Sequence, residues 1–161
     1  MISYPSNRMR SDAGPSQRTP AFPSNTKTAD PAETLMVVDD DPMVRALEVE
    51  ILRLEGYTVL AAEGAREALR LAGETATIHL LVTDFSMPEV DGIELTHRFR
   101  AVHPKAPVLL VSGALPLTEE NTKDLERFEC LPKPFKIKEL VRKVRALLDT
   151  AAPVATGAMS G

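Results

Sequence analysis

Short aliphatic runs alternate along the chain with longer segments in which apolar residues recur every three or four positions. Unbroken aliphatic runs such as VLLV are typical of strands that are buried on both faces of a parallel sheet. Five strands are predicted, at residues 35–38, 57–62, 79–84, 108–112 and 130–132. The alternation predicts an α/β fold, in which helices cover both faces of a doubly wound five-stranded sheet.

Apolar residues at helical spacing predict the buried faces of the helices between these strands. For the first helix the predicted face consists of Val44, Leu47, Ile51 and Leu54. The second helix has Ala65, Ala68, Leu69 and Ala72. The last helix has Ile137, Leu140, Val141, Val144 and Leu147. Five βα units are expected, with a short fourth helix because Pro116 interrupts the segment after Gly113.

The two ends of the chain differ in composition from its middle. Residues 1–33 are rich in Pro, Ser, Asn and Thr and show no apolar period, which predicts a disordered N-terminal tail. Residues 150–161 are small and polar enough to predict a flexible C-terminal tail. A chain of 161 residues, 43% of them hydrophobic, then leaves one folded domain at residues 34–149.

Composition also argues against several classes of function. No segment approaches the roughly 20 apolar residues that cross a bilayer, and none resembles a signal peptide, so a cytoplasmic protein is expected. The single cysteine, Cys130, cannot form an internal disulfide, and three scattered histidines do not suggest a zinc site. A net charge of −4 and the short segment after the last helix argue against direct DNA binding.

Chemically active side chains follow four of the five predicted strands, where an open parallel sheet binds its ligands. They are Asp39, Asp40 and Asp41 after the first strand, Asp84 after the third, Ser112 after the fourth and Lys133 after the fifth. Of these, Asp41 precedes Pro42 and is interpreted as a helix cap.

Carboxylates that crowd together resist ionisation unless a cation joins them. Magnesium prefers oxygen ligands, and it commonly binds one or two carboxylates together with a phosphate group. An aspartate such as Asp84 can attack phosphorus to form an acyl phosphate, while Lys133 and the metal neutralise the transferring group. The residues therefore favour magnesium-dependent phosphoryl chemistry.

Four sequence blocks resemble the signatures of response regulator receiver domains. They are LMVVDDDP, LLVTDFSMPEVDGIEL, VLLVSGA and LPKPF, in the family's order and at suitable intervals over residues 34–149. The resemblance implies a flavodoxin-like fold, as in the chemotaxis receiver, with strand order 2-1-3-4-5 and five helices. It also implies that Asp39 and Asp40 place Mg²⁺, that Asp84 is the phosphoacceptor, and that the backbone carbonyl of Ser86 completes the metal ligands.

For the phosphoryl group, the resemblance implies that Lys133 contacts its oxygens and that Ser112 turns its hydroxyl toward it. The Lys133–Pro134 peptide bond is expected to be cis. Two positions depart from the family. Cys130 replaces the usual Tyr or Phe three residues before the lysine, and Gly113 replaces a more usual Ala. An aromatic rotamer switch is therefore not expected here.

The expected function is that of a signalling domain, which promotes its own phosphorylation and dephosphorylation and is not otherwise an enzyme. It would accept a phosphoryl group from a histidine kinase or a histidine phosphotransfer protein, and signal by binding a downstream protein. One alternative is an interaction module of the same fold that works without phosphorylation. Another is a magnesium-dependent phosphatase. Ser86 argues against it, because this position, two residues after Asp84, would need a second aspartate as general acid.

Overall fold

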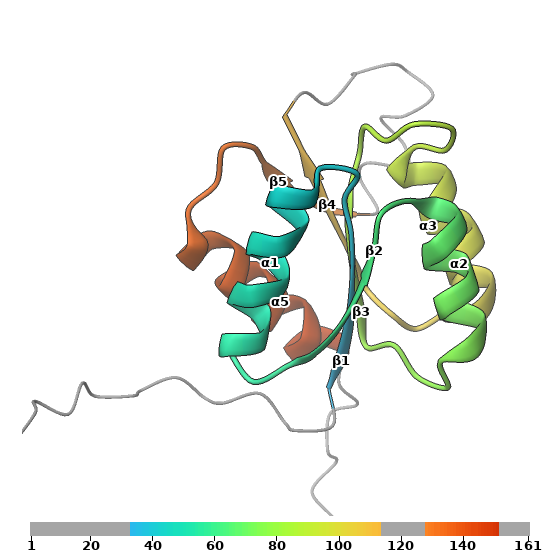
Figure 1. Cartoon of the computed structure of the whole chain (residues 1–161). Helices are drawn as coiled ribbons and strands as arrows, with labels where there is room; N and C mark the ends of the chain where they lie inside the picture. The colour runs from blue at the N-terminus through green and yellow to red at the C-terminus, as the bar shows by residue number, and fades with distance from the viewer. Residues whose placement is uncertain (1–32, 114–127, 152–161) are drawn as a thin grey trace, which may run out of the picture.

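The computed structural model describes residues 33–113 and 128–151 (Figure 1). The predicted short fourth helix lies outside the described residues, as do nearly all of the predicted N-terminal tail and most of the C-terminal one.

The centre of the fold is a five-stranded parallel sheet in the order β2-β1-β3-β4-β5. Its strands are β1 (Thr34–Val38), β2 (Thr58–Ala62), β3 (Leu80–Asp84), β4 (Val108–Ser112) and β5 (Glu129–Pro132). The predicted flavodoxin-like strand order is confirmed. In the register, Asp84 pairs with Val111, and Ser112 pairs with Pro132. The carboxyl ends of the three strands β3, β4 and β5 therefore meet at one edge of the sheet.

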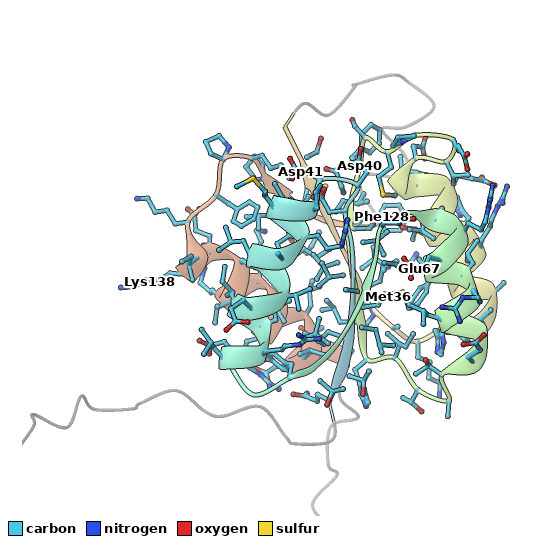
Figure 2. The ribbon with its side chains drawn as sticks, in the orientation of Figure 1. Met36, Asp40, Asp41, Glu67, Phe128 and Lys138 are labelled. Carbon is cyan, nitrogen blue, oxygen red and sulfur yellow. The ribbon has the colours of Figure 1, made fainter. Side chains whose placement is uncertain are left out.

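Helices cover both faces of this sheet, as Figure 1 shows. On one face lie α1 (Pro42–Leu54) and α5 (Ile137–Ala151), and on the other lie α2 (Ala65–Glu74) and α3 (Gly92–Val102). Because side chains alternate along a strand, the sheet contributes to two separate cores. Leu35 and Val37 of β1 pack in the core beneath α1 and α5, whereas Met36 and Val38 pack toward α2 and α3 (Figure 2).

The buried face of α1 differs from the predicted one. Leu47 and Leu54 were expected to be buried but are 53% and 77% exposed, and of the four predicted residues only Ile51 is buried. The helix instead buries Glu48, Val49, Ile51 and Leu52. The prediction was wrong because it counted only apolar residues, and the inward-facing surface of this helix includes a carboxylic acid.

The other helices follow their predicted faces more closely. Ala65, Ala68 and Ala72 of α2 are buried, as expected. In α5 the buried residues are Leu140, Val144 and Leu148, while Ile137 at the first turn is 55% exposed. This helix continues through Ala151, two residues beyond the predicted boundary at residue 149, and the Thr150 hydroxyl donates to the Ala146 carbonyl within it.

Aspartate side chains cap the first turns of α1 and α3. Asp41 Oδ1 accepts hydrogen bonds from the backbone N–H groups of Met43 and Val44, at 2.8 and 3.3 Å. This confirms the predicted cap. Asp91 Oδ1 accepts from the Glu94 N–H at 2.9 Å in the same way. These caps fix the starts of the helices that follow β1 and β3.

Gly92, the first residue of α3, lies against the backbone at the end of β3. A Cβ atom at this position would be 2.5 Å from the Asp84 carbonyl oxygen and 3.1 Å from the Phe85 Cα atom. We expect Gly92→Ala to lower the free energy of unfolding by about 1–3 kcal/mol, because backbone must move to admit the methyl group. Urea denaturation measures this loss.

The matched control for Gly92→Ala is Gly73→Ala in α2. No atom lies within 4 Å of a Cβ built at Gly73, and this glycine is exposed in a helix. Alanine should therefore stabilise the protein there by about 0.5–1 kcal/mol. Equal effects of the two substitutions on stability would contradict the close packing described for Gly92.

Candidate functional site

Three carboxylates meet at the carboxyl ends of β1 and β3. Asp39 and Asp40 follow β1 directly, and Asp84 is the last residue of β3. One oxygen of each carboxylate lies within 4.8 Å of one oxygen of each of the others. Asp39 and Asp84 are buried, whereas Asp40 is exposed. The cluster is therefore anchored in the core and open to solvent on one side.

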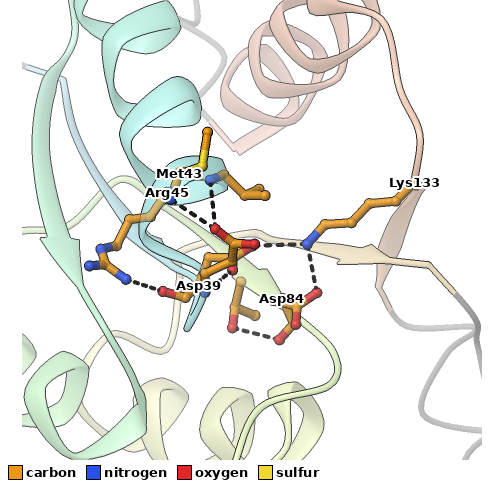
Figure 3. A network of polar contacts seen from close by, with 8 residues as sticks. Asp39, Met43, Arg45, Asp84 and Lys133 are labelled. Atoms are coloured by element: carbon orange, nitrogen blue, oxygen red, sulfur yellow. Dashed lines mark hydrogen bonds and ion pairs between the residues drawn. The ribbon is translucent and has the colours of Figure 1, made fainter.

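Lys133 links two of these carboxylates from the end of β5. Its Nζ atom donates to Asp39 Oδ2 at 2.9 Å and to Asp84 Oδ1 at 3.1 Å (Figure 3). The lysine is 94 residues from Asp39 and 49 from Asp84 along the chain. The sheet thus brings together the four residues that the sequence predicted to converge.

Backbone contacts hold the Asp39 carboxylate in place. Its Oδ1 atom accepts from the Asp41 N–H at 2.8 Å, and the Asp39 carbonyl accepts from the Arg45 guanidinium (Figure 3). The Asp39 N–H donates to the Ala62 carbonyl at 3.3 Å, which extends the pairing of β1 with β2 by one residue. Contacts with α1 and β2, as well as its own strand, therefore fix the position of Asp39.

The electrostatics of this cluster leave it short of positive charge. Burial raises the pKa of Asp84, and the charges of Asp39 and Asp40 add to this effect, while the hydrogen bond and charge of Lys133 oppose it. Burial by itself lowers the pKa of Lys133, but its hydrogen bonds to Asp39 and Asp84 outweigh this and raise it. One ammonium thus does not fully compensate the carboxylates, and an additional cation would favour the ionised form of Asp84.

Ser112 and Lys133 lie at the ends of neighbouring strands. The Lys133 N–H donates to the Ser112 carbonyl at 2.8 Å, and the Lys133–Pro134 peptide bond is cis, as expected. Among the described residues, the buried Ser112 hydroxyl oxygen has no hydrogen-bond partner. Ser86, the predicted carbonyl ligand, is exposed two residues after Asp84 in the loop to α3.

Cys130 is half-buried on β5, and its sulfur lies 3.9 Å from the Phe128 carbonyl oxygen. Phe128 itself is buried in the core beneath α2 and α3, with the Arg100 guanidinium 4.8 Å from its ring centroid (Figure 2). An aromatic ring therefore packs two residues before the position at which the family usually has one.

Glu48 is a buried acid that the sequence analysis did not identify. Only 2% of it is exposed, and among the described residues its Oε1 atom has no hydrogen-bond partner. Burial, followed by the charge of Asp39, raises the pKa of this carboxyl to about 8, with Lys133 opposing the shift and Asp84 adding to it. Its spacing of three and four residues from Ile51 and Leu52 was a signal that could have placed it on the inner face.

The raised pKa of Glu48 predicts a pH-dependent stability. The unfolded chain loses this proton near pH 4.5, whereas the folded protein keeps it until about pH 8, so the folded state binds more protons between these values. The free energy of unfolding should therefore fall as the pH rises through this window, by an amount on the order of 3 kcal/mol.

Urea denaturation of the wild type and Glu48→Gln at about pH 5 and about pH 8 measures this fall. The raised pKa of Asp84 acts in the same direction, so some loss should persist in the variant. Glu50→Gln, which removes an exposed carboxylate from the same helix, is the control. An unchanged pH dependence in Glu48→Gln would contradict the prediction.

Comparison with known proteins identifies the family. The model of the response regulator receiver domain matches residues 35–145. The chain is 36% identical over 118 residues to the sensor kinase CckA of Brucella abortus (strain 2308), which is 72% of this chain and 12% of that protein. It is 33% identical over 114 residues to the transcriptional regulatory protein CpxR of Escherichia coli (strain K12), covering 71% of this chain and 48% of CpxR. The chain thus spans at most about half the length of these relatives.

Solved structures agree with this result. The receiver domain of the hybrid histidine kinase CckA matches with 36% identity and a TM-score of 0.62, over 71% of this chain and 98% of that one. The response regulator TrrA of Thermotoga maritima, solved in complex with Mg²⁺-BeF, matches with 30% identity and a TM-score of 0.61 over the same shares. Within the described residues, no helix has the length and apolar character needed to cross a membrane. The chain belongs to the response regulator receiver domain family of two-component signalling systems.

Proposed function

We propose that this domain accepts a phosphoryl group on Asp84 in a two-component phosphorelay. The observation that carries the proposal is the convergence of Lys133 with the carboxylates of Asp39 and Asp84, at 2.9 and 3.1 Å, beside a third carboxylate from Asp40. Such a group of oxygens suits a hard divalent cation, and Mg²⁺ is the one that commonly completes its shell with phosphate. The likeness to a receiver solved with Mg²⁺-BeF supports this choice.

Each residue has a part in the proposed transfer. An Asp84 carboxylate oxygen forms a bond to phosphorus while the bond from phosphorus to the donor's histidine nitrogen breaks, and that nitrogen leaves with the bonding electrons. Asp39, Asp40, Asp84 and the Ser86 carbonyl would hold Mg²⁺, which supplies positive charge to the phosphoryl oxygens when bound. Lys133 would move one of its hydrogen bonds to a phosphoryl oxygen.

The hydroxyl of Ser112 would donate to the phosphoryl group once it is on Asp84. This proposal is supported by the unsatisfied state of that buried oxygen in the part of the chain that the structure describes. A buried hydroxyl without a partner costs free energy, so a new acceptor at this edge of the sheet would relieve that cost. Phosphorylation adds a charge of about −1.5 to −2, which would redirect Ser112.

The partners proposed are a sensor histidine kinase or a histidine phosphotransfer protein as donor, and a downstream protein that binds the phosphorylated surface. The likeness to the receiver of a sensor kinase and to a transcriptional regulator supports a place in such a relay. We propose that output occurs in the cytoplasm by protein–protein contact and without direct DNA binding. The domain would begin at residue 34, as predicted, and extend to the end of α5 at Ala151.

The test is to incubate the folded chain with a small acyl phosphate and Mg²⁺, and to follow covalent phosphate by intact-mass spectrometry. We expect one alkali-labile phosphoryl group per chain, and none when a chelator removes the cation. Absence of labelling in the folded wild type, with either an acyl phosphate or a phosphohistidine donor, would favour the phosphorylation-independent interaction module. Repeated turnover of a phosphoester would instead favour a phosphatase.

A further inference from the structure

We propose that Glu48 is a positioning residue of the cluster formed by Asp39, Asp40, Asp84 and Lys133. Glu48 carries a proton while this cluster lacks a divalent cation and releases it when one binds. The inference deepens the proposed function and rests on it, since it concerns the same cation site. It assigns a role to a carboxyl that contacts neither the phosphoryl group nor the metal in the proposed transfer.

Glu48 and the cluster lie on the same side of the sheet, the side that α1 and α5 cover. Val37, Val82 and Leu131 pack in the core under α1 and α5. Asp39, Asp84 and Lys133 each follow one of these residues by two positions, so alternation along the strands directs them to the same side. Glu48 is a buried residue of α1, the helix that covers this core and begins three residues after Asp39.

The surroundings of Glu48 explain why it keeps its proton. Its charged neighbours are Asp39 from β1, Asp84 from β3 and Lys133 from β5, and the ammonium of Lys133 is already hydrogen-bonded to both aspartates. From β2 and α5, this core receives the apolar side chains of Val59, Leu140, Val144 and Leu148. Tyr57, which also belongs to this core, precedes β2 at the opposite end of the sheet and interacts with Arg145, which binds Glu33.

An unpartnered oxygen makes Glu48 costly as an anion but tolerable as an acid. Its Oε1 atom accepts no hydrogen bond from the described residues, and burial accounts for the largest part of its raised pKa. The charge of Asp39 is the next cause, and that of Asp84 contributes in the same direction. These two carboxylates are the ones that a bound cation would neutralise.

Cation binding and proton loss are therefore linked. A divalent ion at Asp39 and Asp84 neutralises the two charges that disfavour the glutamate anion, so Glu48 ionises and its proton goes to solvent. By reciprocity, the Glu48 anion strengthens the attraction of the cluster for the ion. Affinity for Mg²⁺ should therefore rise with pH, and the ionisation of Glu48 should make this rise steeper than the aspartates alone would.

Isothermal titration of the full chain with MgCl₂ tests the inference. In two buffers of different ionisation enthalpy, the wild type should release protons on binding Mg²⁺ near neutral pH, and Glu48→Gln should release markedly fewer. Between about pH 6.5 and about pH 8.5, Mg²⁺ affinity should increase in both proteins, and the factor of increase should be at least roughly fivefold greater in the wild type than in Glu48→Gln. A purely structural role would not change the proton count.

Glu50→Gln is the matched control, because it removes an exposed carboxylate from the same helix and should leave proton release unchanged. If Glu48→Gln melts far below the wild type, Glu48→Leu, which fills the site with an apolar side chain, replaces it. Equal proton release by the wild type and by a folded Glu48 variant would overturn the inference and leave the proposed function intact. Failure of the folded wild type to bind Mg²⁺ would overturn the proposed function, and the inference with it.

Discussion

Asp84→Asn is expected to reduce covalent phosphorylation of this chain to background while leaving its fold intact. The amide has no anionic oxygen with which to attack phosphorus. Asp39 is also hydrogen-bonded to Lys133, but it is only 1% exposed, and its two carboxylate oxygens already accept from the Asp41 N–H and from Lys133. Because burial raises the pKa of Asp84, the folded state disfavours its anion, so the neutral amide should not lower the thermal midpoint at neutral pH.

The control for this variant is Asp91→Asn. Asp91 is exposed and caps α3 through its Oδ1 atom, a role that asparagine also performs well. It should be labelled by acyl phosphate at the wild-type rate. Labelling of Asp84→Asn at a similar level would assign the acceptor to another residue, and intact-mass and peptide-mass spectrometry would detect that outcome.

Lys133→Met is expected to slow phosphoryl transfer by roughly 100-fold, because it removes a preorganised charge aimed at the transferring group. The same change should strengthen Mg²⁺ binding. The ammonium lowers the pKa of Asp84. Without it, the carboxylates of Asp39 and Asp84 have no cationic partner among the described residues, and the ion becomes their source of positive charge. Rate and affinity therefore move in opposite directions, which a general loss of structure would not produce.

Single-turnover labelling and Mg²⁺ titration measure the two effects of Lys133→Met. Lys138→Met is the control, since Lys138 extends from the exposed side of α5, away from the cluster (Figure 2). We expect it to match the wild type in both measurements. A transfer rate of Lys133→Met within a few-fold of the wild type, or weaker binding of Mg²⁺, would contradict the role proposed for this lysine.

Much of the fold could be predicted because the strands carry strong local signals. Residues 108–111 form an aliphatic run, VLLV, and all five residues of β4 are buried. The candidate site followed from the same reasoning, since residues after parallel strands meet at one edge. Asp39, Asp84 and Lys133 lie there together, as expected. Their chemical roles stay a proposal until phosphorylation is measured.

The face of α1 could not be predicted in the same way. Leu47 and Leu54 are apolar and exposed, while Glu48 is acidic and buried. Apolar periodicity indicates which side chains are stabilised by burial. The orientation of α1 about its own axis also depends on its Asp41 cap and on packing against the sheet. A buried acid is tolerated when it stays protonated, and that depends on neighbours from other strands.

The order of apolar and polar residues by itself determined the strands, the layering of helices on a parallel sheet, and the set of acidic and basic residues at one edge. These features follow from local periodicity and from the geometry that all parallel sheets share. Only the tertiary structure decided the hydrogen bonds of Lys133 to both Asp39 and Asp84, and the burial of Glu48 near them. Such properties arise from distances and dielectric surroundings between segments far apart in the chain, which no local pattern encodes.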